Sequence, residues 1–263
     1  MGVNYAYLDP KHSKQVMLNM LTQDKTKYLM CEDDKNWKPE FPEDMDALFV
    51  TGTLRGCGNV CKEAVRQDKN WFYMDNGYGP FWKRVTFKGT APTRLLDRPN
   101  DRTPEEPRHL QPWKGGKNWG GENILILPPS LPYMDAFEEI NWLNKLCHTI
   151  NEFTGRNLVI RPKPAKGKKA PPWDSQLATA AVVVSFGSNL AIDAMVKGVP
   201  TISYKYCPAF FGSFKLEDLD TDALMEEPDR EKIINNCMYH SFHKHEFNNG
   251  FAWETSMENA YGS

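Results

Sequence analysis

The sequence predicts an α/β protein built from two Rossmann-like domains, each with a parallel sheet. Two observations lead to this fold class. Short apolar segments alternate with helical ones in both halves of the chain, and residues 88–121 between the halves are rich in proline, glycine and charge. Strands that alternate with helices favour parallel sheets, because a crossover must return the chain to the same edge. We therefore expect two sheets facing a central cleft, with ligands at the carboxyl ends of the strands.

The first half contains four apolar segments of strand length, at 5–9, 27–31, 47–52 and 71–75. Residues 53–70, between the last two, predict a glycine-bearing turn and a helix, which completes a βαβ unit. Residues 88–121 show no periodicity, so we interpret them as a basic linker. This linker ends an expected N-terminal domain of residues 1–120.

The second half is expected to form a C-terminal domain of residues 121–263. Strands are expected within 123–130, 157–164, 182–185 and 200–204, and helices over 134–153, 173–180 and 228–245. A further short helical pattern follows Asn189 and is ended by Gly198. The tail beyond residue 245 is expected to cross back to the N-terminal domain.

Bulk composition places the chain among ordinary globular proteins. It has 263 residues, of which 40% are hydrophobic and 25% charged. It has no apolar run of membrane-spanning length, and its first residues lack the pattern of a signal peptide. Six dispersed cysteines do not form a disulfide framework, and Cys57 and Cys61 lack the second pair of a zinc site. We expect a reduced, cytoplasmic monomer without membrane contact.

Charge is segregated along the chain although the net charge is only −2. Residues 83–117 carry nine Lys and Arg against four acidic residues, and residues 156–169 carry six without any acidic residue. Residues 217–231 are strongly acidic. Such basic stretches favour an anionic partner, although solvated loops of mixed charge explain residues 83–117 as well.

Residues 182–203, VVVSFGSNLAIDAMVKGVPTIS, are the most informative stretch. An apolar strand ends in the uncharged turn Gly187-Ser188-Asn189, which opens directly onto a helix carrying Asp193. Backbone N–H groups and the helix dipole at such a turn favour a phosphate, and Asp193 is placed to accept hydrogen bonds from a ribose. Helix capping is the alternative interpretation, but it explains neither the glycine nor the acid.

Two other strand ends carry charged side chains. Arg161 and Lys163 follow the strand at 157–164 and suit a diphosphate, with a solvated basic loop as the alternative. Asp75 ends an aromatic strand before an Asn-Gly turn, where a carboxylate can act as a general base, unless turn chemistry alone selects it. Arg55 follows a third strand end and is placed to meet a phosphate.

The segment 185–203 resembles the donor-binding segment of GT-B glycosyltransferases and capsule-polysaccharide proteins. In those families a Ser/Gly-rich turn leads into a helix carrying Glu-Ala, followed by Gly-x-Pro; here Asp193-Ala194 and Gly198-Val199-Pro200 take these places. The resemblance implies a GT-B-like fold, in which the turn holds the diphosphate and the acid holds the ribose of a sugar nucleotide. Ser185 stands where retaining members often carry a second acid, and Lys163 replaces a histidine common in the family.

Residues 51–56, 70–80, 81–89 and 248–254 are similar to small phage-encoded GT-B-like proteins associated with glycosylation of hydroxymethylated pyrimidines in phage DNA. This similarity implies transfer of a hexose or pentose from a UDP-sugar to a 5-hydroxymethylpyrimidine in double-stranded DNA, in the cytoplasm of an infected host. The N-terminal domain would then be the acceptor side. No tightly bound cofactor is implied, and no metal is required if cationic side chains and a helix terminus carry the leaving-group charge.

The resemblance distributes roles over the candidate residues. Asp75 would be the base, and donor-binding residues would be Arg161, Lys163, Gly187, Ser188, Asn189 and Asp193. Contacts to DNA would come from Arg55, Tyr78, Arg84, Arg94 and Arg98, with Trp113 and Trp119 available to stack at a flipped base.

Other functions stay open at this point. The same chemistry on a cell-surface glycan or a small molecule, a nucleotide- or DNA-binding module without catalysis, and a sugar-nucleotide epimerase all fit the same fold. His240 and His243 are expected on one face of the last helix, where a polar surface is preferred over a metal site. The Asp-x-Asp spacing at 218–222 lies in an acidic, loop-like stretch and is not interpreted as a metal site.

Overall fold

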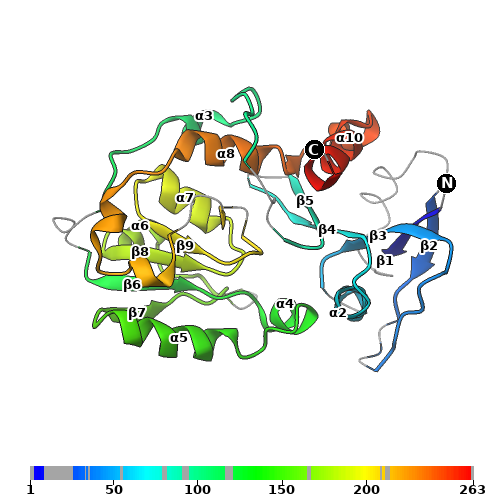
Figure 1. Cartoon of the computed structure of the whole chain (residues 1–263), viewed down its shortest axis with the longest axis horizontal. Helices are drawn as coiled ribbons and strands as arrows, with labels where there is room; N and C mark the ends of the chain where they lie inside the picture. Colours follow the sequence, from blue (N-terminus) through cyan, green and yellow to red (C-terminus); the bar gives the residue numbers. More distant parts are fainter. Residues whose placement is uncertain are drawn as a thin grey trace. The chain divides into compact units, whose positions relative to one another are not determined.

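The computed structural model describes two compact units, each with its own sheet (Figure 1). Unit 1 contains Met1–Pro92, Leu131–Ile140 and Tyr239–Ser263, and unit 2 contains Thr93–Ser130 and Asn141–Met238. The described residues are 3–8, 26–32, 34, 36–53, 56–78, 82–90, 95–115, 121–164, 167–207, 209–210 and 214–261. The predicted α/β fold class with two parallel-rich sheets is confirmed, and none of the described helices is both long and apolar enough to span a membrane.

Unit 1 contains a six-stranded sheet with the order β10-β5-β4-β3-β1-β2. The first four strands of the chain run parallel, while β5 is antiparallel to both of its neighbours. The strands are β1 (Val3–Leu8), β2 (Thr26–Met30), β3 (Met45–Thr51), β4 (Trp71–Asn76), β5 (Lys83–Phe87) and β10 (Ser241–Phe242). The four predicted strands are confirmed. The strand β5 was not predicted, and it lies at the start of the basic stretch 83–117.

Helices cover the sheet of unit 1 because its central strands are apolar on both faces. The helix α2 (Cys57–Arg66) buries one stripe of residues at helical spacing: Cys57, Val60, Cys61 and Ala64. The chain's last helices are α9 (Lys244–Asn248) and α10 (Phe251–Tyr261). Trp253 of α10 lies 5.4 Å from Phe49 and 6.0 Å from Phe72, ring centroid to centroid. The C-terminal segment therefore completes an aromatic core in unit 1.

The expected helix over 228–245 is corrected by the structure. The helix α8 ends at Met238, and the chain then forms β10 (Ser241–Phe242). The N–H of Val85 donates to the carbonyl of His240 at 2.8 Å, so sheet pairing replaces the helix here. His240 is only 5% exposed, and it does not share a helical face with His243, which precedes α9.

Unit 2 contains a four-stranded, fully parallel sheet with the order β7-β6-β8-β9. Figure 1 shows α5 on one face of this sheet and α6 and α7 on the other. The strands are β6 (Asn123–Leu127), β7 (Asn157–Ile160), β8 (Ala180–Ser185) and β9 (Thr201–Ser203). The helices are α3 (Glu105–Arg108), α5 (Trp142–Phe153), α6 (Trp173–Leu177), α7 (Leu190–Val196) and α8 (Arg230–Met238), with 3₁₀ turns η2 (Leu216–Asp218) and η3 (Asp222–Met225).

The single helix expected over 134–153 is two helices in the structure. The helix α4 (Leu131–Ala136) belongs to unit 1, and α5 begins at Trp142 in unit 2. Between them Glu138 adopts a left-handed conformation with φ of 57°, and the N–H of Glu139 donates to the carbonyl of Met134 at 2.8 Å. This backbone geometry is typical of a helix C-terminus, so α4 ends here. The apolar pattern of the sequence continues past this end into α5.

Residues 95–115, expected to be an unstructured linker, are packed against α8. The Asn236 side chain accepts from the N–H of Leu96 at 3.0 Å and donates to its carbonyl at 2.8 Å. The hydroxyl of Thr103 donates to Asn235 at 2.6 Å. The buried guanidinium of Arg230 donates to the carbonyl of Gln111 at 2.9 Å. The buried polar face of α8 thus satisfies the backbone of this segment, which explains why polar residues are buried there.

The acidic stretch at 218–222 also forms contacts within unit 2. Asp220 accepts hydrogen bonds from Thr154 at 2.5 Å and from Arg156 at 2.6 Å. Burial alone would raise the pKa of Asp220, but these two donors outweigh it and lower the pKa. The carboxylate of Asp220 therefore links the end of α5 to the turn that follows η2.

Candidate functional site

The topology of unit 2 marks one edge of its sheet for ligand binding. After β6 the chain passes through α4 of unit 1 before it forms α5 on one face of the sheet, whereas β8 leads directly to α7 on the other face. The strands β6 and β8 are neighbours. Loops that diverge from adjacent parallel strands leave a crevice between them, and open α/β sheets bind ligands there. The carboxyl ends of β6 and β8 are therefore the candidate site in unit 2.

The turn after β8 occupies this edge, and serine hydroxyls satisfy part of its backbone. The N–H of Ser188 donates to the hydroxyl of Ser185 at 3.0 Å, and the N–H of Leu190 donates to the hydroxyl of Ser188 at 3.2 Å. The Ser188 hydroxyl therefore accepts from the first N–H of α7, and the amide of Ser188 itself is engaged. Gly187 and Asn189 are half-buried in the same turn.

Asp193 lies in α7, half-buried and one turn from the start of the helix. The glycine of the Gly-Val-Pro motif that follows has a packing role. Gly198 has a φ of 78°, and a Cβ there would lie 2.0 Å from the carbonyl oxygen of Pro112. The N–H of Lys114 donates to the carbonyl of Gly198 at 2.8 Å. Close approach of the 111–115 segment thus requires this glycine, independently of any ligand.

Arg161 follows β7 and is held by α6. Its guanidinium donates to the carbonyl of Pro171 at 2.8 Å and to the side chain of Gln176, and it lies 5.5 Å from the centre of the Trp173 ring. Lys163, two residues further along the loop, is exposed. Because β6 separates β7 from β8, the ends of these strands are about 10 Å apart. Arg161 thus ties its loop to α6.

An aromatic cluster at the ends of β8 and β9 was missed by the sequence analysis. The ring of Phe186 stacks on Tyr204 at 5.3 Å and on Tyr206 at 4.9 Å, and Trp142 meets it edge-on at 5.0 Å. Phe186 is fully buried, whereas Tyr204 is 38% exposed. The signal in the sequence is the Tyr-x-Tyr that follows a strand end directly. This arrangement places an aromatic ring at the ligand-binding edge of the sheet.

The loop after β9 is packed against the turn after β8. The Sγ of Cys207 lies 3.8 Å from the hydroxyl of Ser185 and 3.8 Å from the carbonyl of Ser188. Lys205, in the same loop, is exposed and its Nζ lies 4.9 Å from the Tyr206 ring. The ends of the neighbouring strands β8 and β9 therefore carry a polar turn, the aromatic ring of Tyr204 and the cationic side chain of Lys205.

In unit 1, Asp75 lies near the carboxyl end of β4, as the strand pattern predicts. It is half-buried, and its carboxylate accepts from the N–H of Asn76 at 2.7 Å and from the hydroxyl of Tyr73 at 3.4 Å. The N–H of Gly52, at the end of parallel β3, donates to the carbonyl of Met74 at 2.9 Å. Asp75 thus shares the carboxyl edge of the parallel strands with the glycine-bearing turn at 52.

Tyr73 and Arg84 surround Asp75 inside the sheet. Burial and the neighbouring carboxylate raise the pKa of Tyr73 well above its usual value, so the phenol stays protonated and can donate. Arg84 pairs with Asp75 in the β4–β5 register and is only 4% exposed. Arg84 was expected to contact DNA, and the strand β5 carries it into the interior of unit 1.

The other residues expected on the acceptor side are described only in part. Arg55, Arg94 and Trp119 lie outside the described residues. Tyr78 is half-buried after β4, and Arg98 is half-buried in the segment that packs on α8. The indole N–H of Trp113 donates to the carbonyl of Leu224 at 3.1 Å.

Several cations of the basic stretch are bonded to the chain itself. Lys88 pairs with Asp68 at 2.6 Å, and Arg108 donates to the carbonyls of Thr103 and Asn100 at 2.7 Å each. The Asp68 carboxylate offsets the charge of Lys88, whereas Arg108 keeps its charge and is held against its own segment by hydrogen bonds.

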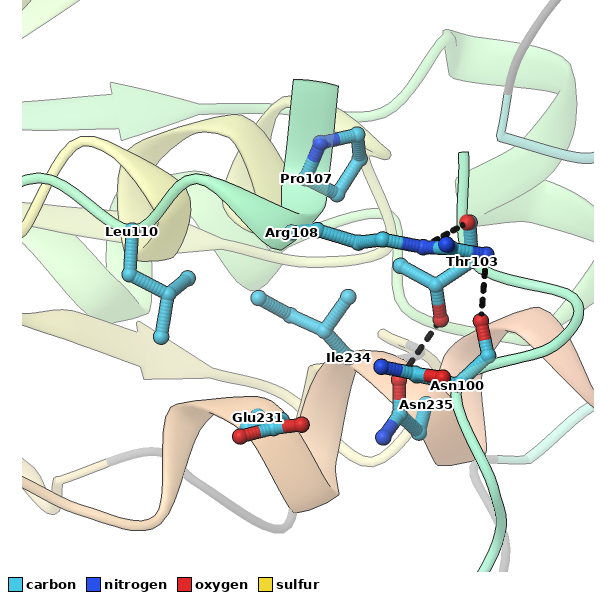
Figure 2. A pocket seen from close by; sticks show the side chains of 8 residues that line it. All are labelled: Asn100, Thr103, Pro107, Arg108, Leu110, Glu231, Ile234 and Asn235. Atoms are coloured by element: carbon cyan, nitrogen blue, oxygen red, sulfur yellow. Dashed lines mark hydrogen bonds between the residues drawn. The ribbon is translucent and has the colours of Figure 1, made fainter. Parts of the chain in front are cut away.

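A pocket of about 80 Å³ lies elsewhere in unit 2, between residues 100–110 and α8 (Figure 2). Figure 2 shows the Arg108 side chain extended toward Thr103 and Asn100, and Thr103 bonded to Asn235. The lining residues are Asn100, Thr103, Pro107, Arg108, Leu110, Glu231, Ile234 and Asn235. The pocket has room for a few water molecules, and none of its lining residues follows a strand end. We interpret it as a packing gap.

No group of three His, Cys, Asp or Glu side chains in the described part of the chain is arranged to hold a metal ion. No protein-family model matches the sequence, and no curated protein matches it. Among solved structures, the chain is similar to the beta Kdo 2,4 transferase of Thermosulfurimonas dismutans KpsC, with 11% identity, a TM-score of 0.44 and coverage of 92% of each chain. It is also similar to the beta Kdo 2,7 transferase of the same KpsC, with 11% identity, a TM-score of 0.47 and coverage of 96% of this chain and 99% of that one.

Proposed function

We propose that the protein is a glycosyltransferase that uses a nucleoside-diphosphate sugar, with a UDP-sugar as the donor. One observation carries the proposal. The parallel sheet of unit 2 presents the turn at 187–189, the acid of α7 and the exposed ring of Tyr204 at the carboxyl edge where such sheets bind ligands. The resemblance of residues 185–203 to the donor segment of GT-B glycosyltransferases supports it.

The parts of the donor are assigned by their chemistry. Asp193 accepts hydrogen bonds from the ribose, and Tyr204 offers a face on which the nucleobase stacks. Since serine hydroxyls engage the amides of Ser188 and Leu190, the diphosphate requires additional positive charge. Lys163 after β7 and Lys205 after β9 are exposed, and their strands flank β6 and β8 on either side. We assign the leaving-group charge to these lysines, which makes a metal unnecessary.

The reaction follows from these roles. The acceptor hydroxyl attacks the anomeric carbon, the bond from that carbon to the diphosphate oxygen breaks, and the hydroxyl proton passes to Asp75. The protonated phenol of Tyr73 orients the Asp75 carboxylate. We propose the 5-hydroxymethyl group of a pyrimidine in double-stranded DNA as the acceptor, on the similarity of residues 70–89 to phage-encoded proteins. A glycan or a small molecule is the alternative acceptor.

Donor binding is tested by calorimetric titration of UDP into the full chain and into three variants. Tyr204→Ala should weaken UDP binding about tenfold or more, since stacking on an aromatic ring contributes about 1–3 kcal/mol. Asp193→Asn should also weaken it. The control is Tyr28→Ala, because Tyr28 has the same exposure of 38% but lies in unit 1. Equal affinity in all variants would place the donor elsewhere.

Acceptor chemistry is tested separately by the mass of nucleosides after incubation with UDP-sugars and DNA containing hydroxymethylcytosine or hydroxymethyluracil. A hexose or pentose increment is expected, and Asp75→Asn should slow its appearance by about 10²–10⁴-fold with UDP affinity unchanged. Saturable UDP binding without any DNA product would keep the donor site and remove DNA as the acceptor. Product formed at the normal rate by Asp75→Asn would remove Asp75 as the base.

A further inference from the structure

Two buried cysteines of unit 1 are in direct contact. The Sγ atoms of Cys31 and Cys57 lie 3.2 Å apart, and the two residues are 3% and 0% exposed. Cys31 is the first residue after β2, and Cys57 is the first residue of α2. These residues are distant in sequence, so the fold itself brings the two thiols together.

The backbone around the two thiols is built for this close approach. Gly56 precedes Cys57 with a φ of 84°, and a Cβ there would lie 2.2 Å from the carbonyl oxygen of Glu32 and 3.2 Å from the Cβ of Cys31. The N–H of Cys31 donates to the carbonyl of Leu8 at 3.0 Å, which fixes the other side of the contact. Only glycine allows the start of α2 to approach the end of β2 this closely.

We propose that Cys31 and Cys57 form a reversible disulfide that fastens the edge strand β2 to α2. The sulfurs need to move together by about 1 Å to reach bonding distance, which is within the reach of side-chain rotation. This inference does not depend on the proposed transferase activity, because it concerns only the packing of unit 1.

The strand β2 is the element that gains most from such a bond. It lies at the edge of the sheet, and among the described strands it pairs only with β1. The side chains of Tyr28 and Met30 are 38% and 46% exposed, so the strand buries little apolar surface of its own. A covalent link from Cys31 to α2 therefore restrains a strand that is otherwise held mainly by backbone hydrogen bonds.

The chemistry is thiol–disulfide exchange with a small disulfide such as oxidised glutathione. Because the two thiols are 3% and 0% exposed, the exchange proceeds through local opening of the edge strand β2. One cysteine thiolate then attacks the glutathione disulfide, which forms a mixed disulfide and releases one glutathione thiolate. The second cysteine thiolate then attacks the protein sulfur of the mixed disulfide and releases the second glutathione. The two protons lost by the cysteines pass to the two glutathione thiolates, and the protein is oxidised by two electrons.

Cys61, one turn further along α2, is not the partner. It is as buried as Cys57, at 0% exposed, but the sulfur–sulfur contact of 3.2 Å joins Cys31 to Cys57. Replacing Cys61 by Ser is therefore expected to leave the Cys31–Cys57 bond intact. Cys147 on α5 of unit 2 is half-buried and provides a second control away from the contact.

The test equilibrates the full chain in buffers of increasing oxidised-to-reduced glutathione ratio, traps free thiols by alkylation and maps peptides by mass spectrometry. The expected species is lighter than the reduced protein by two hydrogen atoms before alkylation, with residues 31 and 57 in one cross-linked peptide. Hydrogen exchange over residues 26–31 should slow in this species. The cross-link should form in Cys61→Ser and Cys147→Ser and be absent from Cys31→Ser.

Two results would overturn the proposal. One is full alkylation of Cys31 and Cys57 at every glutathione ratio, when the equilibrated wild-type chain is acid-quenched and unfolded before the reagent is added. The other is a cross-link that joins Cys57 to Cys61. Both are read on the wild-type protein, so they do not require that any cysteine variant folds.

Discussion

Single residues of unit 2 show that a segment resembling a donor-binding motif also has packing roles. Gly198 belongs to the Gly-x-Pro that resembles a donor-binding motif, yet its conformation is required by the carbonyl of Pro112. The hydroxyl of Ser188 likewise accepts from the first N–H of α7, and its turn lies at the candidate ligand-binding edge. The serine hydroxyls of this turn accept backbone N–H groups, as the capping interpretation of the sequence expects.

The packing role of Gly198 predicts a stability change. Gly198→Ala should lower the free energy of unfolding by about 1–3 kcal/mol or more, because the new Cβ meets the Pro112 carbonyl and the residue must keep a positive φ. Chemical denaturation of the full chain measures this.

Two other glycines distinguish the steric clash from the cost of a positive φ. Gly167 has a φ of 82° and Gly155 lies outside the positive-φ region, and both have open space where a Cβ would be added. Gly167→Ala should cost about 1 kcal/mol from the backbone alone, and Gly155→Ala should change stability by no more than about 0.5 kcal/mol. A Gly198→Ala protein as stable as Gly155→Ala would refute the steric argument.

At the scale of elements, the strands that the sequence predicts are those with continuous apolar runs. The strand β8 is buried along its whole length, and β3 and β4 carry four consecutive buried residues each, so their patterns are unambiguous. The strand β5 was missed because Lys83 and Arg84 open it, and only tertiary pairing with β4 makes Arg84 a buried residue. Similarly, local sequence does not show that residues 241–242 leave a helix to pair with β5.

The candidate site was predictable to the same extent. The turn at 187–189, Asp193 and Asp75 all follow or flank apolar strands, and the structure places them at carboxyl edges. The engagement of Arg161 by Pro171 and Gln176 depends on how the loop folds back, which no local pattern encodes. The Phe186–Tyr204 stack joins two strand ends, so it emerges only once β8 and β9 are paired.

The docking of residues 95–115 on α8 predicts a local effect of one side chain. Asn236→Ala removes both hydrogen bonds to the backbone of Leu96 and leaves those groups unsatisfied, which should cost about 1–3 kcal/mol. Limited proteolysis should then cut within 95–115 faster than in the wild type. Asn144→Ala, at an exposed position of α5, is the control and should leave the cleavage rate unchanged. Equal rates in all three proteins would show that Asn236 does not hold the segment.

At the scale of the whole molecule, each unit is assembled from segments that are distant in sequence. Unit 1 takes residues 131–140 and 239–263 from beyond its first stretch, and unit 2 takes residues 93–130 from before the point where the chain returns to unit 1. The C-terminal return is explained by the aromatic core around Trp253, and the early segment is explained by its bonds to α8. Because of these long-range contacts, the two units do not coincide with the expected domains of residues 1–120 and 121–263.

We propose that the edge formed by β6 and β8 in unit 2 binds the nucleoside diphosphate of a sugar donor. The most direct measurement is hydrogen exchange of the full chain, followed by mass spectrometry, with and without saturating UDP. We predict slower exchange over 185–193 and 203–207, where the turn, Asp193 and Tyr204 lie. Slower exchange confined to 100–110 and α8, around the pocket of Figure 2, or no change anywhere, would contradict the claim.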